Sequence, residues 1–160
     1  MIAIHQFTYG KFRNFTEQHY EAIRTALSVV PLFVEKSDIE RDLWQKYALI
    51  NVLSGLTSLF QASVGDIRDS SQGMDTFKQA FQETSEVIRL AGGKLNEGFI
   101  EKQLLMIEKW PREATSSTFR DLSLGLPTEF EHIQGYGGAS ASVRMQRSPS
   151  RDHPREVGDL

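Results

Sequence analysis

Hydrophobic positions near the start of the chain follow first a strand-like and then a helical pattern. The opening stretch IAIHQFTYGKF is rich in β-branched and aromatic residues and predicts one or two short strands. Residues 14–30 have the helical spacing, with Asn14 as a candidate N-cap, and Pro31 ends them before the strand-like LFVE. The predicted inward positions of this helix are Tyr20, Ile23, Leu27 and Val30. Residues 1–36 therefore predict a β-α-β unit, which is too small to bury both faces of a sheet by itself.

From Ser37 onward the helical period dominates. Ser37 and Glu40 fit a capping box, and the apolar pattern after them predicts one long helix to about Gln61, with Ser54 and Gly55 inviting a bend or a close approach. A turn is expected around residue 65. The next helix, from about residue 74 to 91, has one apolar face and ends at two glycines. That face consists of Phe77, Ala80, Phe81, Thr84, Val87, Ile88 and Ala91.

Shorter helical segments follow, and then the pattern stops. Asn96 is a candidate cap for a helix ending at Trp110, and further helices are expected at about 116–124 and from Pro127 to about 134. Residues 137–160 lack any apolar period and are rich in Arg, Ser, Pro and Gly, which predicts disorder. The fold class expected is therefore mainly α, with an all-helical unit over 37–136 after the β-α-β unit.

Composition narrows the function without defining it. The 160 residues carry a net charge of −3, which offers no basic surface for nucleic acid. The absence of cysteine excludes disulfides and thiolate metal sites and fits a reducing, cytoplasmic environment. The longest apolar run, ALSVVPLFV, is too short to cross a bilayer, and the N-terminal residues do not resemble a signal peptide. We therefore expect neither a nucleic-acid nor a membrane partner.

Two glycine clusters and the histidines suggest no site. Gly93-Lys94 fails the phosphate-loop pattern, which would need glycine at 88 and serine or threonine at 95. Residues 135–138 include three glycines but follow a predicted helix rather than a strand, which argues against a dinucleotide loop. The histidines show no ligand spacing, so no metal is predicted.

Lys46 is harder to explain, because it lies within the apolar helix DLWQKYALINVLSGLTSL. One explanation is that its stem packs on the core while its ammonium reaches water. The other is a position on a cleft wall, where an ammonium anchors an acid or protonates a developing alkoxide. Positions 46, 50, 54 and 57 share a helix face, so Ser54 and Thr57 are candidates for the same cleft.

The segment SSTFRDLSLGLPTEFEHIQG, residues 116–135, contains a second set of candidates. Ser116 or Ser117 fits a helix cap, and Glu129 fits a helix N-terminus, so capping alone explains these residues. Physical reasoning by itself does not connect them to Lys46.

A family resemblance makes that connection. DIERDLWQKYALINVLSGLTSL is similar to a helix with a Trp-x-Lys signature in the ketopantoate reductase (2-dehydropantoate 2-reductase) family. VGDIRDS with the amphipathic helix after it, and the segment 116–135, resemble two further family pieces in the same order. The likeness covers about residues 1–136. It implies a helical C-terminal domain of the 6-phosphogluconate-dehydrogenase-like type, preceded over residues 1–36 by the remnant of a Rossmann domain.

The resemblance also implies a chemistry and a set of site residues. It implies an NADPH-dependent reductase of a small 2-oxo acid, in which Lys46 and Glu129 are catalytic and Ser117 binds substrate. Ser54 and Asn51 are added as candidate substrate contacts. Cofactor-binding residues are not assigned, because the family's glycine loop is absent, and this chain alone is expected to bind no NADPH.

Departures from the family leave two alternatives open. Many members carry asparagines four and eight residues after the lysine, where this chain has Ile50 and Ser54, so another 2-oxo acid is a candidate substrate. The composition of residues 137–160 suggests a truncated or out-of-frame end. The first alternative is the catalytic half of a reductase, inactive alone. The second is a noncatalytic helical module for binding or dimerisation, and a homodimer is compatible with either.

Overall fold

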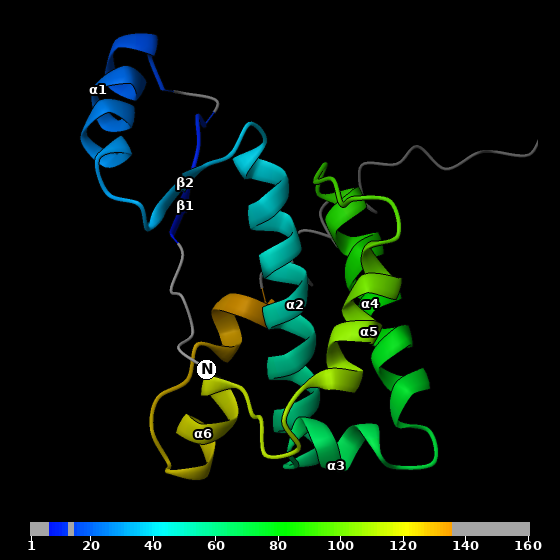
Figure 1. Cartoon of the computed structure of the whole chain (residues 1–160). Helices are drawn as coiled ribbons and strands as arrows, with labels where there is room; N and C mark the ends of the chain where they lie inside the picture. Colours follow the sequence, from blue (N-terminus) through cyan, green and yellow to red (C-terminus); the bar gives the residue numbers. More distant parts are fainter. Residues whose placement is uncertain (1–6, 13–14, 136–160) are drawn as a thin grey trace, which may run out of the picture.

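The first unit of the fold is a two-stranded parallel sheet with one helix. A computed structural model describes residues 7–12 and 15–135 of the chain (Figure 1). The elements of this unit are β1 (Phe7–Tyr9), α1 (Glu17–Ser28) and β2 (Phe33–Glu35). The strands pair in parallel with Phe7 opposite Phe33, and their rings stack at 5.4 Å. The predicted β-α-β order is thus present, whereas a domain boundary at residue 36 stays a prediction.

The helix of this unit buries less than its sequence pattern predicts. Of the four inward positions, Tyr20 is buried, but Ile23 and Val30 are 39% and 37% exposed. The two short strands cover only part of one face of α1. The apolar stripe of the helix is longer than this covered part, so its remaining side chains stay exposed. The capping prediction was also wrong, because Thr16 caps α1 and accepts a hydrogen bond from the His19 amide at 3.3 Å.

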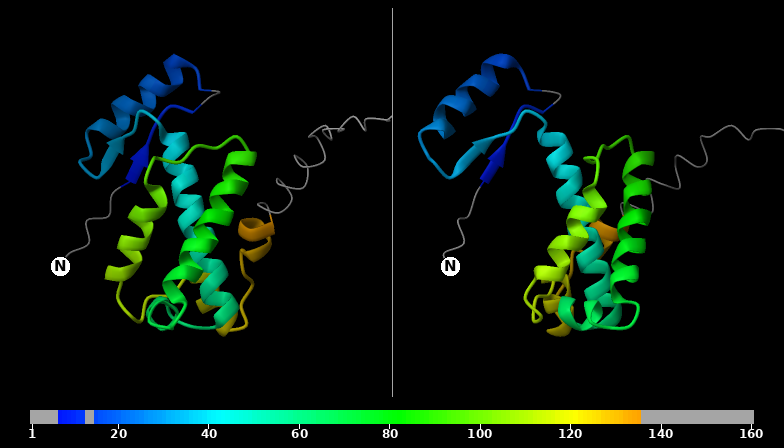
Figure 2. Two further views of the ribbon diagram at one scale, coloured as in Figure 1. Left: turned by 90° about the vertical axis from the view of Figure 1, so that its right-hand side faces the viewer. Right: turned by 45° about the vertical axis from the view of Figure 1, so that its right-hand side comes forward.

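The second unit is built around one long helix, α2. Figures 1 and 2 show α4 and α5 running alongside α2, while α6 and the first unit lie on its other side in Figure 1. Its elements are α2 (Ile39–Phe60), α3 (Val64–Arg68), α4 (Gly73–Leu90), α5 (Phe99–Lys109), α6 (Ser117–Ser123) and the π-helical turn η1 (Glu131–Gly135). The predicted mainly α fold is confirmed. The predicted disordered segment 137–160 lies outside the described residues.

Several helix starts differ from the predictions. Asp38 rather than Ser37 caps α2, with its carboxylate accepting from the Arg41 amide at 3.1 Å, because aspartate caps as well as serine. Helix α5 begins after Gly98, whose φ of 66° provides the left-handed turn, and not at Asn96.

Two further segments of the helical unit were also predicted wrongly. The expected turn around Gly65 is the short helix α3, in which Gly65 is buried and a Cβ would lie 2.5 Å from the Cα of Arg112. A regular helix from Pro127 is absent, and the chain forms only the π-helical turn η1 after Glu129. The η1 turn is held by hydrogen bonds to α2, which are described below, and not by the hydrogen bonds of a longer helix.

The core lies between α2, α4 and α5. Phe77 and Phe81 on α4 are fully buried, as are Ala48 on α2 and Ile107 on α5. Phe81 also meets Phe99 edge to face at 6.0 Å. Burial of each phenylalanine contributes about 1.5–3 kcal/mol of transfer free energy. Among the helices of the described residues, none is long and apolar enough to cross a membrane.

Candidate functional site

The N-terminal half of α2 has an exposed stripe with Lys46 at its centre. Leu43 is 50% exposed and Ile50 37% exposed, and Lys46 between them is also exposed. These three residues are spaced by three and four, so they lie on one face of the helix. Within residues 7–12 and 15–135, the Lys46 ammonium has no hydrogen-bond or ion-pair partner. The amine is therefore available to solvent or to a ligand.

Further along the same face, the stripe passes under α6. Ser54 is only 2% exposed, and its hydroxyl accepts a hydrogen bond from Thr118 at 3.3 Å. Thr57 is fully buried; its hydroxyl donates to the Leu53 carbonyl at 2.6 Å and lies 2.7 Å from the Ser116 hydroxyl. These polar contacts hold the start of α6 against α2.

Ser117 is the first residue of α6, immediately after this anchoring contact. Ser116 provides the N-cap, with its hydroxyl accepting from the Phe119 amide at 3.0 Å. Of the two serines offered by the sequence, Ser116 is therefore the cap, and Ser117 is free of that task and exposed. Because Ser116 and Thr118 are bound to α2, the Ser117 backbone is fixed next to the α2 face.

Glu129 is carried by the segment that leads into η1. Its carbonyl accepts from the amides of His132 and Ile133, both at 3.0 Å, and its side chain is exposed. The η1 turn is in turn attached to α2, because the Tyr47 hydroxyl donates to the Ile133 carbonyl at 3.0 Å. In a second bond, the side-chain amide of Gln134 donates to the backbone carbonyl of Asn51 at 3.2 Å. The turn that follows Glu129 is thus tied to α2 at Tyr47 and Asn51.

Asn51 points away from the exposed stripe. Its side-chain amide donates to Thr84 on α4 at 3.0 Å. This bond, like the burial of Ser54, directs the side chain to the packing between helices. Contact of Asn51 or Ser54 with a substrate stays a prediction, but in this structure both support the elements around Lys46.

The anchoring residues themselves were missed by sequence reasoning. Thr57 was a candidate for the cleft wall but is part of the buried contact, and Thr118 and Tyr47 gave no signal. A serine at a helix start was visible at Ser116, but its partner on α2 is 59 positions away in sequence. Only the fold brings these hydroxyl groups together.

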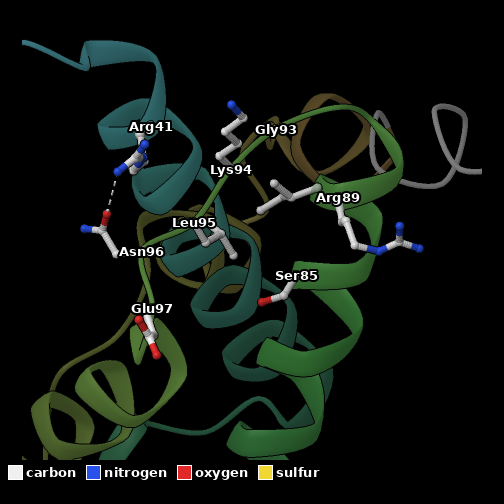
Figure 3. A pocket seen from close by; sticks show the side chains of 9 residues that line it. Arg41, Ser85, Arg89, Gly93, Lys94, Leu95, Asn96 and Glu97 are labelled. Carbon is white, nitrogen blue, oxygen red and sulfur yellow. Dashed lines mark hydrogen bonds between the residues drawn. The ribbon is translucent and has the colours of Figure 1, made fainter.

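A hollow near the ends of α2 and α4 contains three basic side chains but does not direct them to one point. It has a volume of about 470 Å³. Arg41 is bound to Asp38 at 2.8 Å and to Asn96 at 3.3 Å, and Arg89 pairs with an acidic residue of its own helix. Figure 3 shows the Lys94 ammonium and the Arg89 guanidinium pointing away from each other and from Arg41. This arrangement does not hold a single small anion.

A larger hollow of about 640 Å³ lies between the C-terminal half of α2, α6 and the segment before η1. Its walls are mainly apolar, and no lysine or arginine lines it. The lining residues are Gly55, Leu56, Ser58, Leu59, Thr118, Leu122, Thr128, Phe130 and Glu131. A 2-oxo acid would find no counter-charge there. No group of three His, Asp or Glu side chains suited to a metal occurs within the described part of the chain.

Comparison with known proteins identifies the family. The family described as "Ketopantoate reductase PanE/ApbA C terminal" matches residues 38–142. The chain belongs to this ketopantoate reductase family. It is 30% identical over 135 residues to the uncharacterized oxidoreductase YkpB of Bacillus subtilis, covering 84% of this chain and 45% of that protein.

Solved structures have the same fold. A dimeric ketopantoate reductase from Staphylococcus aureus superposes with a TM-score of 0.74 at 17% identity, over 88% of this chain and 48% of that one. The 2-dehydropantoate 2-reductase from Methylococcus capsulatus gives 0.70 at 21% identity, over 86% and 44%. D-mandelate dehydrogenase, solved with NADH and anilino(oxo)acetate, gives 0.67 at 14% identity, over 85% and 57%. The chain therefore spans about half the length of these relatives.

Proposed function

We propose that this chain is the substrate-binding and catalytic half of an NADPH-dependent 2-oxo acid reductase of the cytoplasm. Family membership and similarity to an oxidoreductase support an oxidoreductase role. The observation that carries the proposal is that α6 and η1 both pack on α2, the helix that carries Lys46. Lys46 lies on the exposed face of α2, Ser117 follows a contact to Thr57, and Glu129 precedes a turn bound to Tyr47.

The described residues do not provide a cradle for the cofactor. A dinucleotide needs a glycine-rich turn between a strand and a helix. The connection after β1 contains Gly10, but a Cβ there would lie 2.5 Å from the Lys36 carbonyl oxygen and 2.6 Å from Ile39. That space is filled by the chain's own backbone and core. We therefore assign cofactor binding to the other half of a complete enzyme.

The proposed chemistry of this chain concerns the keto oxygen. When the keto carbon is reduced by hydride, its oxygen gains negative charge, and an ammonium can donate a proton to it. Lys46 is the proposed donor, and it leaves this step as a neutral amine that solvent reprotonates. Ser117 is proposed to donate a hydrogen bond to the substrate carboxylate, and Glu129 to help hold the polar substrate.

A second candidate function is a noncatalytic helical module that binds another protein or a second copy. Large apolar side chains near the C-terminal end of α2 and after α6 favour it, since Leu59 and Leu124 are both 73% exposed. Exposed apolar patches mark interaction surfaces. A dimeric solved relative supports the same surface-based candidate.

Turnover in a complete enzyme separates the two functions. The chain would be fused to the nucleotide-binding half of a relative, and reduction of 2-oxo acids followed by NADPH absorbance. Lys46→Ala should lower turnover by about 10²-fold or more, the scale for losing a general acid. Lys102→Ala on the exposed face of α5 is the matched control and should change turnover less than twofold or so. Equal turnover of the two variants, with folding intact by circular dichroism, would favour the noncatalytic module.

A further inference from the structure

The residues next to Lys46 on its helix face are apolar, and this affects which substrate side chain can lie there. Leu43 lies one turn before the lysine and Ile50 one turn after it, and both keep more than a third of their surface exposed. Side chains on a helix lean toward its N-terminus, so Ile50 covers the surface over the turn that begins at Lys46. A molecule held by the ammonium would therefore touch the Ile50 side chain.

Two polar side chains near Ile50, those of Asn51 and Ser54, are turned into the packing between helices. Ser54, one turn further, is buried and accepts from Thr118 at 3.3 Å. Asn51 donates to Thr84 at 3.0 Å on the α4 side. A hydroxyl group on a ligand next to Ile50 would thus lose hydrogen bonds to water without gaining one from these residues.

We infer that the site takes a 2-oxo acid with an apolar, branched side chain, and that Ile50 determines this preference. The inference rests on the proposed function, because it needs the carboxylate and keto groups to be held at Lys46 and Ser117. The apolar substituent of the substrate then packs on Ile50 and Leu43. A 2-oxo acid with a hydroxylated side chain is disfavoured at the same place.

Trimethylpyruvate and ketopantoate provide a matched pair of probes. They share one carbon skeleton and differ by a single hydroxyl group on a terminal carbon. Binding of each to the 160-residue chain would be measured by NMR titration, with signals of Lys46 and Ile50 as reporters. Because an apolar pocket rejects an added hydroxyl by up to about 10²-fold and this site is open on one side, trimethylpyruvate should bind about tenfold more tightly.

Variants at Ile50, Leu105 and Lys46 test whether Ile50 causes the preference for trimethylpyruvate. Ile50→Asn should abolish or reverse the preference, and Ile50→Gln repeats the test with a residue of higher helix propensity. Leu105→Asn, at an exposed apolar position on α5, should leave the preference unchanged. Lys46→Ala should weaken both acids to the same extent, since the ammonium contacts groups that they share.

The outcomes of these titrations distinguish a failure of this inference from a failure of the proposed function. Binding of both acids at Lys46 without a preference, or with ketopantoate tighter, overturns the inference and leaves the proposed function standing. A preference for trimethylpyruvate that survives both Ile50 variants also overturns it. If neither acid perturbs Lys46 at millimolar concentration, the proposed function fails, and the inference fails with it.

Discussion

Replacing Thr57 by valine removes one hydroxyl group from the contact between α2 and α6 while keeping the shape of the side chain. Thr57 is fully buried, and its hydroxyl proton is used by the Leu53 carbonyl at 2.6 Å. In its 2.7 Å contact with Ser116 it must therefore be the acceptor. A chain of hydrogen bonds results, from the Phe119 amide to Ser116, then to Thr57, and on to Leu53.

The magnitude follows from which group loses its partner. Thr57→Val leaves the Ser116 hydroxyl without its acceptor in a half-buried contact, at a cost of about 1–3 kcal/mol. Ser116→Ala removes the cap of α6, at about 1 kcal/mol. The double variant no longer contains the stranded hydroxyl. Its loss of stability should therefore be smaller than the sum of the single losses, by about 1 kcal/mol.

Urea unfolding of the full chain, followed by circular dichroism, gives the four free energies of this cycle. Ser63→Ala is the matched control, because Ser63 caps α3 through the Asp66 amide at 3.1 Å and its hydroxyl bonds to Asp66 rather than to Thr57. Thr57→Val and Ser63→Ala should be additive within about 0.5 kcal/mol. If Thr57→Val and Ser116→Ala are equally additive, the hydrogen-bond chain does not exist, and the stated reason for the position of Ser117 is wrong.

Two further predictions concern the core and the first unit. Phe81→Ala should destabilise the chain by about 3–5 kcal/mol, because the ring is fully buried against Phe99; urea unfolding would measure it, and a loss below 1 kcal/mol would contradict the described core. The pKa of Tyr20 is raised to about 12, first by its 2.6 Å hydrogen bond to Glu35 and then by burial. Because the folded pKa exceeds the unfolded one, the contribution of this bond is present below pH 10 and is lost as the pH rises through about 12. Tyrosinate absorbance of the chain and of Tyr20→Phe should differ by one late-titrating group, and an ordinary titration would refute the bond.

Helices with one strongly apolar face could be predicted from the sequence because the period alone specifies them. The face of α4 is such a case: Phe77, Phe81, Thr84 and Ile88 all reach the core. Cap positions were less certain, since neighbouring residues such as Ser37 and Asp38 compete for the same role. The short helix α3 was missed, because a glycine that packs against Arg112 looks in sequence like a turn.

The helix face that carries the candidate site residues could be predicted from the sequence, but the elements that cover this face could not. A helical wheel places 46, 50, 54 and 57 on one face, and α2 agrees with that. The wheel does not show which elements cover that face at each position along the helix. Lys46 and Ile50 are exposed, whereas Ser54 and Thr57 are covered by α6, whose N-cap Ser116 is 59 residues from Thr57 in the chain. A contact between such distant residues has no periodic signature.

The position of Lys46 explains how a lysine occurs within an apolar helix without disturbing it. Two residues along a helix turn by about 200°, so Lys46 lies nearly opposite Ala48, which is fully buried toward the core. The apolar sequence of α2 is required by that opposite face and by the covered C-terminal half. Folding therefore places little constraint on residue 46, and a solvated lysine costs little there. It also places little constraint on residue 50, where an exposed isoleucine contributes less to packing than a buried one. Because the core requires neither residue, substitutions at Lys46 and Ile50 can test the proposed binding of a substrate without a large loss of stability.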